Sequence, residues 1–155
     1  PSRQDVGSYQ RIRNTLEQKA GQINGARSEV DMVPIRYVNR GYSRQELFGI
    51  YRSAHVGLVT PLRDGMNLVA KEYVAAQDPE DPGVLVLSKF AGAAEQLTDA
   101  LLINPHSMEE TSEAIREAID MPLAERKARW QKLNEVIKTA NVEKWRADFV
   151  EALSA

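Results

Sequence analysis

Two carboxylates, Asp64 and Glu72, stand on either side of a predicted strand-to-helix turn. The apolar run 56–60 before them is typical of a buried parallel strand, and a helix is predicted over 66–77 directly after the turn. A helix N-terminus presents free backbone N–H groups and a partial positive charge, so it suits a phosphate or a diphosphate. Carboxylates can accept hydrogen bonds from sugar hydroxyls, each contributing roughly 1.5–3 kcal/mol. The spacing therefore favours a nucleotide sugar, with Asp64 on the hexose, the helix N-terminus on the diphosphate and Glu72 on the ribose.

A plainer interpretation of both carboxylates stays open at this point. Asp64 can act as a helix N-cap, worth about 1 kcal/mol, and Glu72 can be a solvated surface residue. Gly65, between them, is predicted to let the backbone turn sharply and approach a ligand closely. His55 and His106 are far apart in a chain without cysteine, whereas a zinc site needs three or four ligands. We therefore expect no metal site.

The elements that must position these residues alternate between strand and helix. Strands are predicted over 32–38, 56–60, 84–88 and 100–103. Helices are predicted over 5–24, after the Ser43 capping box, over 66–77, within 90–96, and after Ser107, Pro122 and Asn141. Pro34 should confine the first strand to a sheet edge, and Gly21 and Gly25 should weaken and then end the first helix. The alternation predicts an α/β fold, a Rossmann-like parallel sheet with helices on both faces.

Apolar residues at steps of three and four predict one apolar face on each helix, buried on the helix after Ser107 and partly left exposed on the last helix. The predicted faces are Tyr9, Ile12, Leu16, Ala20 and Ile23 on the first helix; Ala114, Ile115, Ala118 and Ile119 on the helix after Ser107; Trp130, Leu133 and Ile137 on the next; and Val142, Trp145, Phe149 and Leu153 on the last.

Composition excludes several classes of partner. The 155 residues carry a formal net charge of −2, so no basic excess exists to bind nucleic acid or a membrane surface. No apolar run approaches the roughly 20 residues that a membrane-spanning helix needs. The absence of cysteine fits a cytoplasmic protein.

The run from Leu58 to Ala75, with its central string Arg63–Glu72, closely resembles the signature of trehalose-6-phosphate synthases. The runs 83–88 and 90–97 and the pair Asn104-Pro105 extend the resemblance over nearly the whole chain. These proteins are retaining glycosyltransferases with two Rossmann-like domains. The resemblance implies transfer of glucose from UDP-glucose to glucose 6-phosphate, giving trehalose 6-phosphate and UDP. It implies no cofactor, no metal and no protein nucleophile, because the departing phosphate oxygen deprotonates the acceptor hydroxyl.

The resemblance also assigns residues. Asp64 is the catalytic residue and binds the transferred glucose, and Arg3 matches an arginine that binds the acceptor phosphate. The implied nucleotide-sugar site comprises Tyr42, Asp64, Gly65, Met66, Asn67, Leu68, Val69, Ala70, Lys71 and Glu72. Within it, Leu68 and Val69 supply N–H groups to the diphosphate, and Tyr42 falls where the main chain holds uracil. Met66 and Asn67 contact the sugar and phosphates.

The resemblance covers only the C-terminal part of such an enzyme. We therefore expect residues 1–155 to be a partial nucleotide-sugar-binding C-terminal domain that is inactive alone. An open gap between strands 32–38 and 56–60 predicts self-association, and hence a homo-oligomer. Two alternatives stay open: a related transferase with another phosphorylated acceptor, glycerol 3-phosphate or a cyclitol phosphate, and a non-catalytic regulatory subunit of a trehalose synthase complex.

Overall fold

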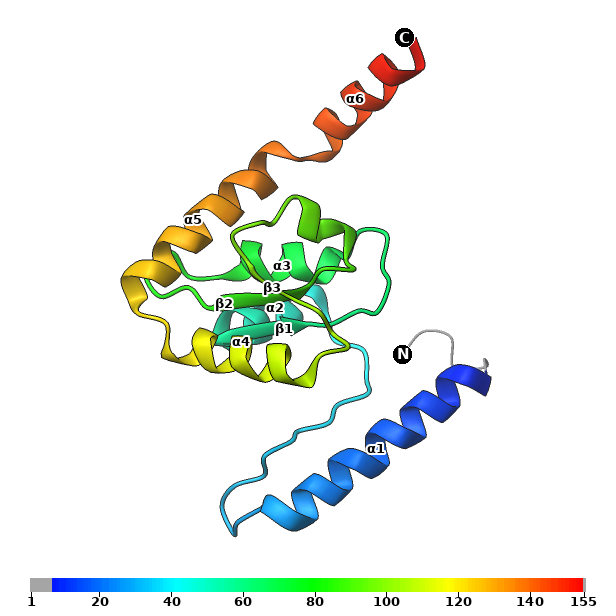
Figure 1. The fold of residues 1–155 in the computed structure, drawn as a ribbon, viewed down its shortest axis with the longest axis vertical. Helices are drawn as coiled ribbons and strands as arrows, with labels where there is room; N and C mark the ends of the chain where they lie inside the picture. Colours follow the sequence, from blue (N-terminus) through cyan, green and yellow to red (C-terminus); the bar gives the residue numbers. More distant parts are fainter. Residues whose placement is uncertain (1–6, 155) are drawn as a thin grey trace. The chain divides into compact units, whose positions relative to one another are not determined.

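The computed structural model describes residues 7–154 and divides the chain into two compact units. The first unit is Pro1–Ser43 and the second is Arg44–Ala155. Figure 1 shows a long helix in the first unit and a parallel sheet with its helices in the second.

The first unit contains α1, Gly7–Arg27, followed by a segment without a strand. The prediction that Gly21 and Gly25 end this helix was wrong. Both lie inside α1, where a side chain would meet nothing within 4 Å. Glycine lowers helix propensity by about 1 kcal/mol relative to alanine but does not block the i→i−4 hydrogen bonds, so the helix continues.

The predicted strand 32–38 is also absent. Instead, the side chain of Asn24 in α1 makes two hydrogen bonds to the backbone of Ile35. Its Nδ2 donates to the Ile35 carbonyl at 2.8 Å, and its Oδ1 accepts from the Ile35 N–H at 2.9 Å. The backbone N–H and C=O groups of a strand need hydrogen-bond partners, which a neighbouring strand usually supplies. At Ile35 the side-chain amide of Asn24 supplies them instead. On α1 itself, Ala20 is buried, whereas the rest of the predicted face is exposed: Tyr9, Ile12, Leu16 and Ile23.

The second unit is built on three parallel strands in the order β1-β2-β3. They are β1, Val56–Val59; β2, Val84–Ser88; and β3, Leu101–Ile103. Val56 pairs with Val84, and Val86 with Leu101. The helices are α2, Arg44–Ser53; α3, Leu68–Ala76; the 3-10 helix η1, Gly92–Glu95; α4, Met108–Asp120; α5, Leu123–Thr139; and α6, Val142–Ser154.

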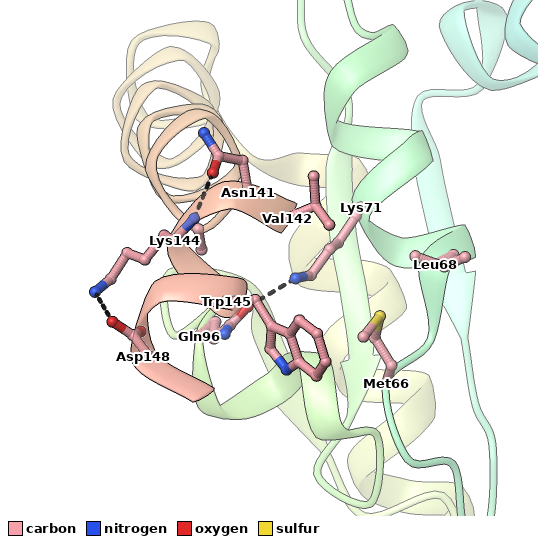
Figure 2. A pocket seen from close by; sticks show the side chains of 10 residues that line it. Met66, Leu68, Lys71, Gln96, Asn141, Val142, Lys144, Trp145 and Asp148 are labelled. Atoms are coloured by element: carbon pink, nitrogen blue, oxygen red, sulfur yellow. Dashed lines mark hydrogen bonds and ion pairs between the residues drawn. The ribbon is translucent and has the colours of Figure 1, made fainter. Parts of the chain in front are cut away.

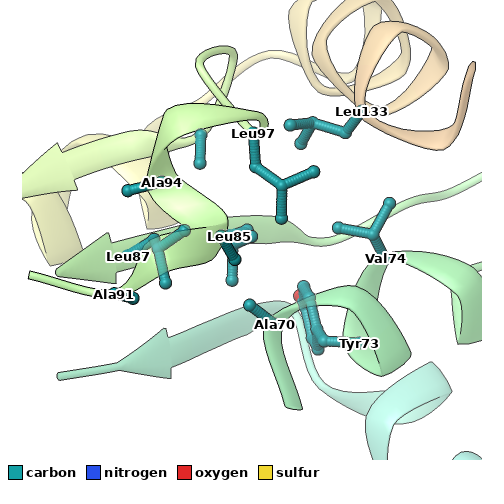
Figure 3. Close-up of a cluster of buried hydrophobic side chains, with 11 residues drawn as sticks. Ala70, Tyr73, Val74, Leu85, Leu87, Ala91, Ala94, Leu97 and Leu133 are labelled. Carbon is teal, nitrogen blue, oxygen red and sulfur yellow. The ribbon is translucent and has the colours of Figure 1, made fainter. Parts of the chain in front are cut away.

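Both faces of β2 are covered, which confirms the predicted α/β architecture. Leu85 and Leu87 point into a cluster with Leu97 and with Leu133 of α5, under the buried face of α3 (Figure 3). Val84 and Val86 belong to a second cluster, with Ala114 and Ala118 of α4. Figure 1 shows α4 on the opposite side of the sheet from α3. Alternation along the strand thus divides the core into two layers. The continuous apolar run predicted this correctly, because all five residues of β2 are buried.

Two burial predictions failed at the periphery. β1 was expected to be buried, but it lies at the end of the sheet and Leu58 is 47% exposed. Ile119 was expected on the buried face of α4, but it is exposed near the end of that helix. In both cases the sequence pattern identified the element but not the absence of a covering neighbour.

Tyr73 of α3 fits a slot that two glycines leave open. A Cβ at Gly57 would lie 2.8 Å from the Tyr73 ring, and one at Gly83 would overlap its hydroxyl group. The hydroxyl donates to the carbonyl of Ala54 at 2.9 Å, and burial raises the pKa of this phenol above its usual value. The ring therefore fixes α3 against β1 and against the turn that precedes β2.

The last helix is capped as predicted but keeps an open face. Oδ1 of Asn141 accepts from the N–H groups of Glu143 and Lys144, both at 3.0 Å. Trp145 and Phe149 stack with ring centroids 5.3 Å apart. The apolar face as a whole is exposed: Val142, Trp145, Phe149 and Leu153.

Candidate functional site

The segment between β1 and α3 is docked on the turn that follows β2. The Asp64 N–H donates to the carbonyl of Phe90 at 3.1 Å, and the Gly92 N–H donates to the Asp64 carbonyl at 3.0 Å. Ala93 N–H donates to the Met66 carbonyl at 2.7 Å. The buried hydroxyl of Ser88 holds the start of the segment, donating to the Pro61 carbonyl at 2.7 Å. The segment is therefore anchored along its length by the protein backbone.

The Asp64 carboxylate is held by two donors from its own loop. Met66 N–H donates to Oδ1 at 3.2 Å, and the Asn67 Nδ2 donates to Oδ2 at 3.1 Å. An ionised carboxylate has about four acceptor sites, so each oxygen keeps capacity for a ligand hydroxyl. The residue is exposed. The interpretation of Asp64 as the N-cap was wrong, because Asn67 occupies that position.

The chain bends at Gly65, as predicted, whereas the left-handed backbone lies at Asn67. Asn67 has φ 73° and ψ 85°, in the left-handed region, whereas no glycine among residues 7–154 has a positive φ. Asparagine is one of the few residues that tolerate this conformation. Gly65 keeps an open side instead, since a Cβ there would meet nothing within 4 Å.

The N-terminus of α3 offers two backbone donors. Among the described residues, neither Leu68 N–H nor Val69 N–H has a protein acceptor. Ala70 differs, because its N–H donates to Oδ1 of Asn67 at 3.0 Å and its side chain is fully buried. The free donors of the helix end are thus at Leu68 and Val69.

Glu72 and Lys71 face different surroundings one turn further along. Glu72 is half-buried, and within the described chain its carboxylate has neither a hydrogen bond nor an ion pair. Burial raises the pKa of the Tyr51 phenol, and the nearby Glu72 carboxylate raises it further. Lys71 Nζ donates to Oε1 of Gln96 at 2.7 Å.

A pocket of about 490 Å³ adjoins the start of α3. Figure 2 shows Lys71 reaching from α3 toward Gln96, with Trp145 of α6 on another wall. Its lining residues are Met66, Leu68, Lys71, Gln96, Ala140, Asn141, Val142, Lys144, Trp145 and Asp148. Sequence periodicity placed Trp145 on an apolar helix face, but it did not indicate which other element that face would meet.

The predicted residues from Asp64 to Glu72 all lie in the second unit, and all except the buried Ala70 are at least partly exposed. Tyr42 belongs to the first unit, where the Arg40 guanidinium lies 4.8 Å from its ring centroid. Arg3 lies outside the described residues. No three His, Asp or Glu side chains in residues 7–154 group as metal ligands, and no helix there is long and apolar enough to cross a membrane.

Sequence reasoning missed Gly92. A Cβ there would overlap the carbonyl oxygen of Gly65 and lie 2.8 Å from its carbonyl carbon, so only glycine lets the segment dock. The signal available was the run of small residues from Ala91 to Ala94 after a buried strand, which is typical of close packing.

The chain resembles known proteins over its whole length. The sequence profile described as Glycosyltransferase family 20 matches residues 1–155. The trehalose-6-phosphate synthase of Sinorhizobium fredii is 53% identical over 154 residues, which cover 99% of this chain and 33% of the relative. That of Klebsiella pneumoniae is 54% identical over 152 residues, covering 98% of this chain and 32% of the relative.

Solved structures agree with this. An α,α-trehalose-phosphate synthase (UDP-forming) from Burkholderia xenovorans, in complex with glucose-6-phosphate, has a TM-score of 0.95 at 53% identity and covers 100% of this chain and 34% of that chain. An E. coli structure bound with UDP-2-fluoro glucose has a TM-score of 0.94 at 51% identity and covers 98% of this chain and 34% of that one. This chain thus spans about a third of the length of its relatives. It belongs to glycosyltransferase family 20.

Proposed function

We propose that this chain is the donor-binding part of an α,α-trehalose-phosphate synthase, which transfers glucose from UDP-glucose to glucose 6-phosphate with retention. The observation that carries the proposal is the pairing of an anchored, exposed Asp64 carboxylate with the free N–H groups of Leu68 and Val69. A carboxylate for sugar hydroxyls beside a helix end for a diphosphate suits a nucleotide sugar. Relatives that are solved with glucose-6-phosphate or with UDP-2-fluoro glucose support both substrates.

In this proposal each residue has a separate role. Asp64 accepts hydrogen bonds from hydroxyls of the transferred glucose, and Leu68 and Val69 donate to the diphosphate. Glu72, half-buried and without a protein partner in the described chain, accepts from the ribose. Tyr42 contributes main-chain contacts to uracil, and Arg3 binds the acceptor phosphate.

The reaction breaks the bond between glucose C1 and the phosphate oxygen, and it forms a bond from C1 to the acceptor hydroxyl on the same face. The departing phosphate oxygen takes the proton of that hydroxyl. Negative charge develops on the leaving diphosphate, and the partial positive charge of the α3 N-terminus stabilises it there. The chain's own part is therefore to hold the donor and to stabilise the leaving group, without a protein nucleophile.

A chimera tests the proposal directly. This chain would replace the matching third of the Klebsiella pneumoniae relative, and UDP release would be measured with UDP-glucose and glucose 6-phosphate. We expect turnover that requires both substrates, while the 155-residue chain alone should bind UDP-glucose weakly in calorimetry and release no UDP. A folded chimera that binds UDP-glucose without turnover would support the regulatory-subunit alternative.

The acceptor is tested on the full-length protein that carries this chain. Greater activity with glycerol 3-phosphate or a cyclitol phosphate than with glucose 6-phosphate would identify a related transferase.

We also propose self-association of the chain, by a route that differs from the predicted gap. Because residues 32–38 form no strand, the open edge is that of β1 itself, at the end of the sheet. Lysine on an edge strand discourages pairing with another chain. Light scattering should show dimers or larger species for the wild type and a monomer for Leu58→Lys. Met108→Lys, at an exposed apolar residue on α4, is the control and should leave association unchanged. A monomeric wild type at high concentration would contradict the proposal, and so would equal association in Leu58→Lys.

A further inference from the structure

We propose that Asn67 is the positioning residue for Asp64, and that its side chain is directed at the protein rather than at the ligand. The inference rests on the proposed function and deepens it. It leaves the expected contacts of Asn67 with the sugar and phosphates to the main chain of that residue.

The two ends of the Asn67 amide are engaged by different parts of the site. Oδ1 accepts from the Ala70 N–H at 3.0 Å, and Nδ2 donates to Oδ2 of Asp64 at 3.1 Å. This orientation is the one that chemistry allows, since a backbone N–H needs an acceptor and an ionised carboxylate needs a donor. One side chain therefore joins the Asp64 carboxylate to the first turn of α3.

The backbone of Asn67 supports the same conclusion. At φ 73° it is the one non-glycine residue with a positive φ among residues 7–154. Glycine adopts this region at no steric penalty, whereas an L-residue there costs roughly 1–2 kcal/mol. The chain thus places a side chain at a position where glycine would be the easier fit, and the two hydrogen bonds of that side chain offset the conformational penalty.

The consequence for the site is a fixed geometry before any ligand binds. Asp64 Oδ1 is held by the Met66 N–H and Oδ2 by Asn67. The Asn67 amide also caps the helix that carries Leu68 and Val69. The same residue therefore fixes the positions of the hexose-binding carboxylate and of the diphosphate-binding N–H groups. Ordering a free side chain on binding costs roughly 0.5–1.5 kcal/mol, and this arrangement avoids that cost for Asp64.

Two substitutions separate the functions of the amide. Asn67→Asp keeps an acceptor for the Ala70 N–H but removes the donor to Asp64 and adds a negative charge beside it. We expect its melting temperature to fall, because one stabilising hydrogen bond is lost and two carboxylates are brought together, and its kcat/KM for UDP-glucose to fall about tenfold or more, the size of one lost charge-assisted hydrogen bond. Asn67→Gly keeps the left-handed backbone but loses both contacts, so both melting temperature and kcat/KM should fall.

Ser107→Ala is the matched control, because Ser107 caps α4 through the Glu110 N–H at 3.2 Å and lies outside residues 64–72, the donor segment. It should lower the melting temperature and leave kcat/KM unchanged. Asn67→Asp with kcat/KM within about twofold of the wild type would overturn the proposal. So would an equal loss of kcat/KM in Ser107→Ala.

A ligand-free measurement distinguishes this proposal from the proposed function. Three-bond couplings of the Asp64 Hβ protons, measured by NMR on the 155-residue chain, should report one side-chain rotamer in the wild type. Both Asn67 variants should give averaged couplings. If the wild-type chimera fails to turn over, the proposed function fails, whereas unchanged couplings in the variants refute the role of Asn67 alone.

Discussion

Replacing Asp64 with alanine is expected to lower kcat/KM for UDP-glucose by at least about a hundredfold in the chimera. The carboxylate is held by Met66 and Asn67 with free acceptor capacity on both oxygens. Two charge-assisted hydrogen bonds to glucose hydroxyls contribute roughly 3–6 kcal/mol together, and each 1.4 kcal/mol is a factor of ten. The variant should remain folded, because the exposed carboxylate lies outside the buried clusters.

Initial rates at subsaturating UDP-glucose, with circular dichroism on the same samples, measure this effect. Asp120→Ala is the control, since Asp120 is an exposed carboxylate at the end of α4. An acidic residue at a helix C-terminus is mildly unfavourable, so its removal should leave the fold and the rate intact. An Asp64→Ala chimera that keeps at least about a fifth of wild-type kcat/KM would refute the assignment of Asp64.

Gly92→Ala is expected to displace the donor segment, although Gly92 itself is not among the residues proposed to bind the ligand. The added Cβ would overlap the carbonyl oxygen of Gly65, and it would lie 2.8 Å from the Gly65 carbonyl carbon and 3.3 Å from the Met66 nitrogen. All three are backbone atoms, so no side-chain rotation relieves the contact. The segment must move away and weaken the bonds from Gly92 N–H to Asp64 and from Ala93 N–H to Met66. We expect a loss of about 2 kcal/mol in unfolding free energy and at least a tenfold loss in donor affinity.

Urea unfolding of the chain and calorimetric titration of the chimera with UDP-glucose measure the two effects. Gly49→Ala is the matched control, because Gly49 lies within α2 and a Cβ there meets nothing within 4 Å. That change should stabilise the chain by roughly 0.5–1 kcal/mol and leave donor affinity unaltered. The docking role of Gly92 is wrong if Gly92→Ala binds UDP-glucose as tightly as the wild type.

The sheet could be predicted where consecutive residues are apolar, because such a run is typical of a buried strand. The five residues of β2 are all apolar or small and all buried, so their pattern carried enough information. Residues 32–38 have similar propensity but form no strand, because a strand depends on a neighbour that local sequence does not specify. The exposure of Leu58 on β1 has the same origin, since that strand has a neighbour on one side only.

The site was predictable to the extent that it is local. Asp64 and the helix end at Leu68 and Val69 follow from a strand, a turn and a helix in succession. The bend at Gly65 was predicted correctly, but the left-handed backbone of Asn67 was not predicted, because glycine is the usual residue in that conformation. Gly92 could not be identified as necessary, since its constraint arises from a contact with Gly65 across a loop, a helix and a strand.

The packing of Tyr73 against Gly57 and Gly83 limits which substitutions this fold can accept. Tyr73 directly follows Glu72, and its ring fills the space that Gly57 and Gly83 leave open. A side chain at either glycine would collide with this ring, so a substitution at Gly57 or Gly83 would require Tyr73 to change or move as well. Selection for a different nucleotide sugar should then preserve the spacing from Asp64 to Glu72 and act on residues outside α3.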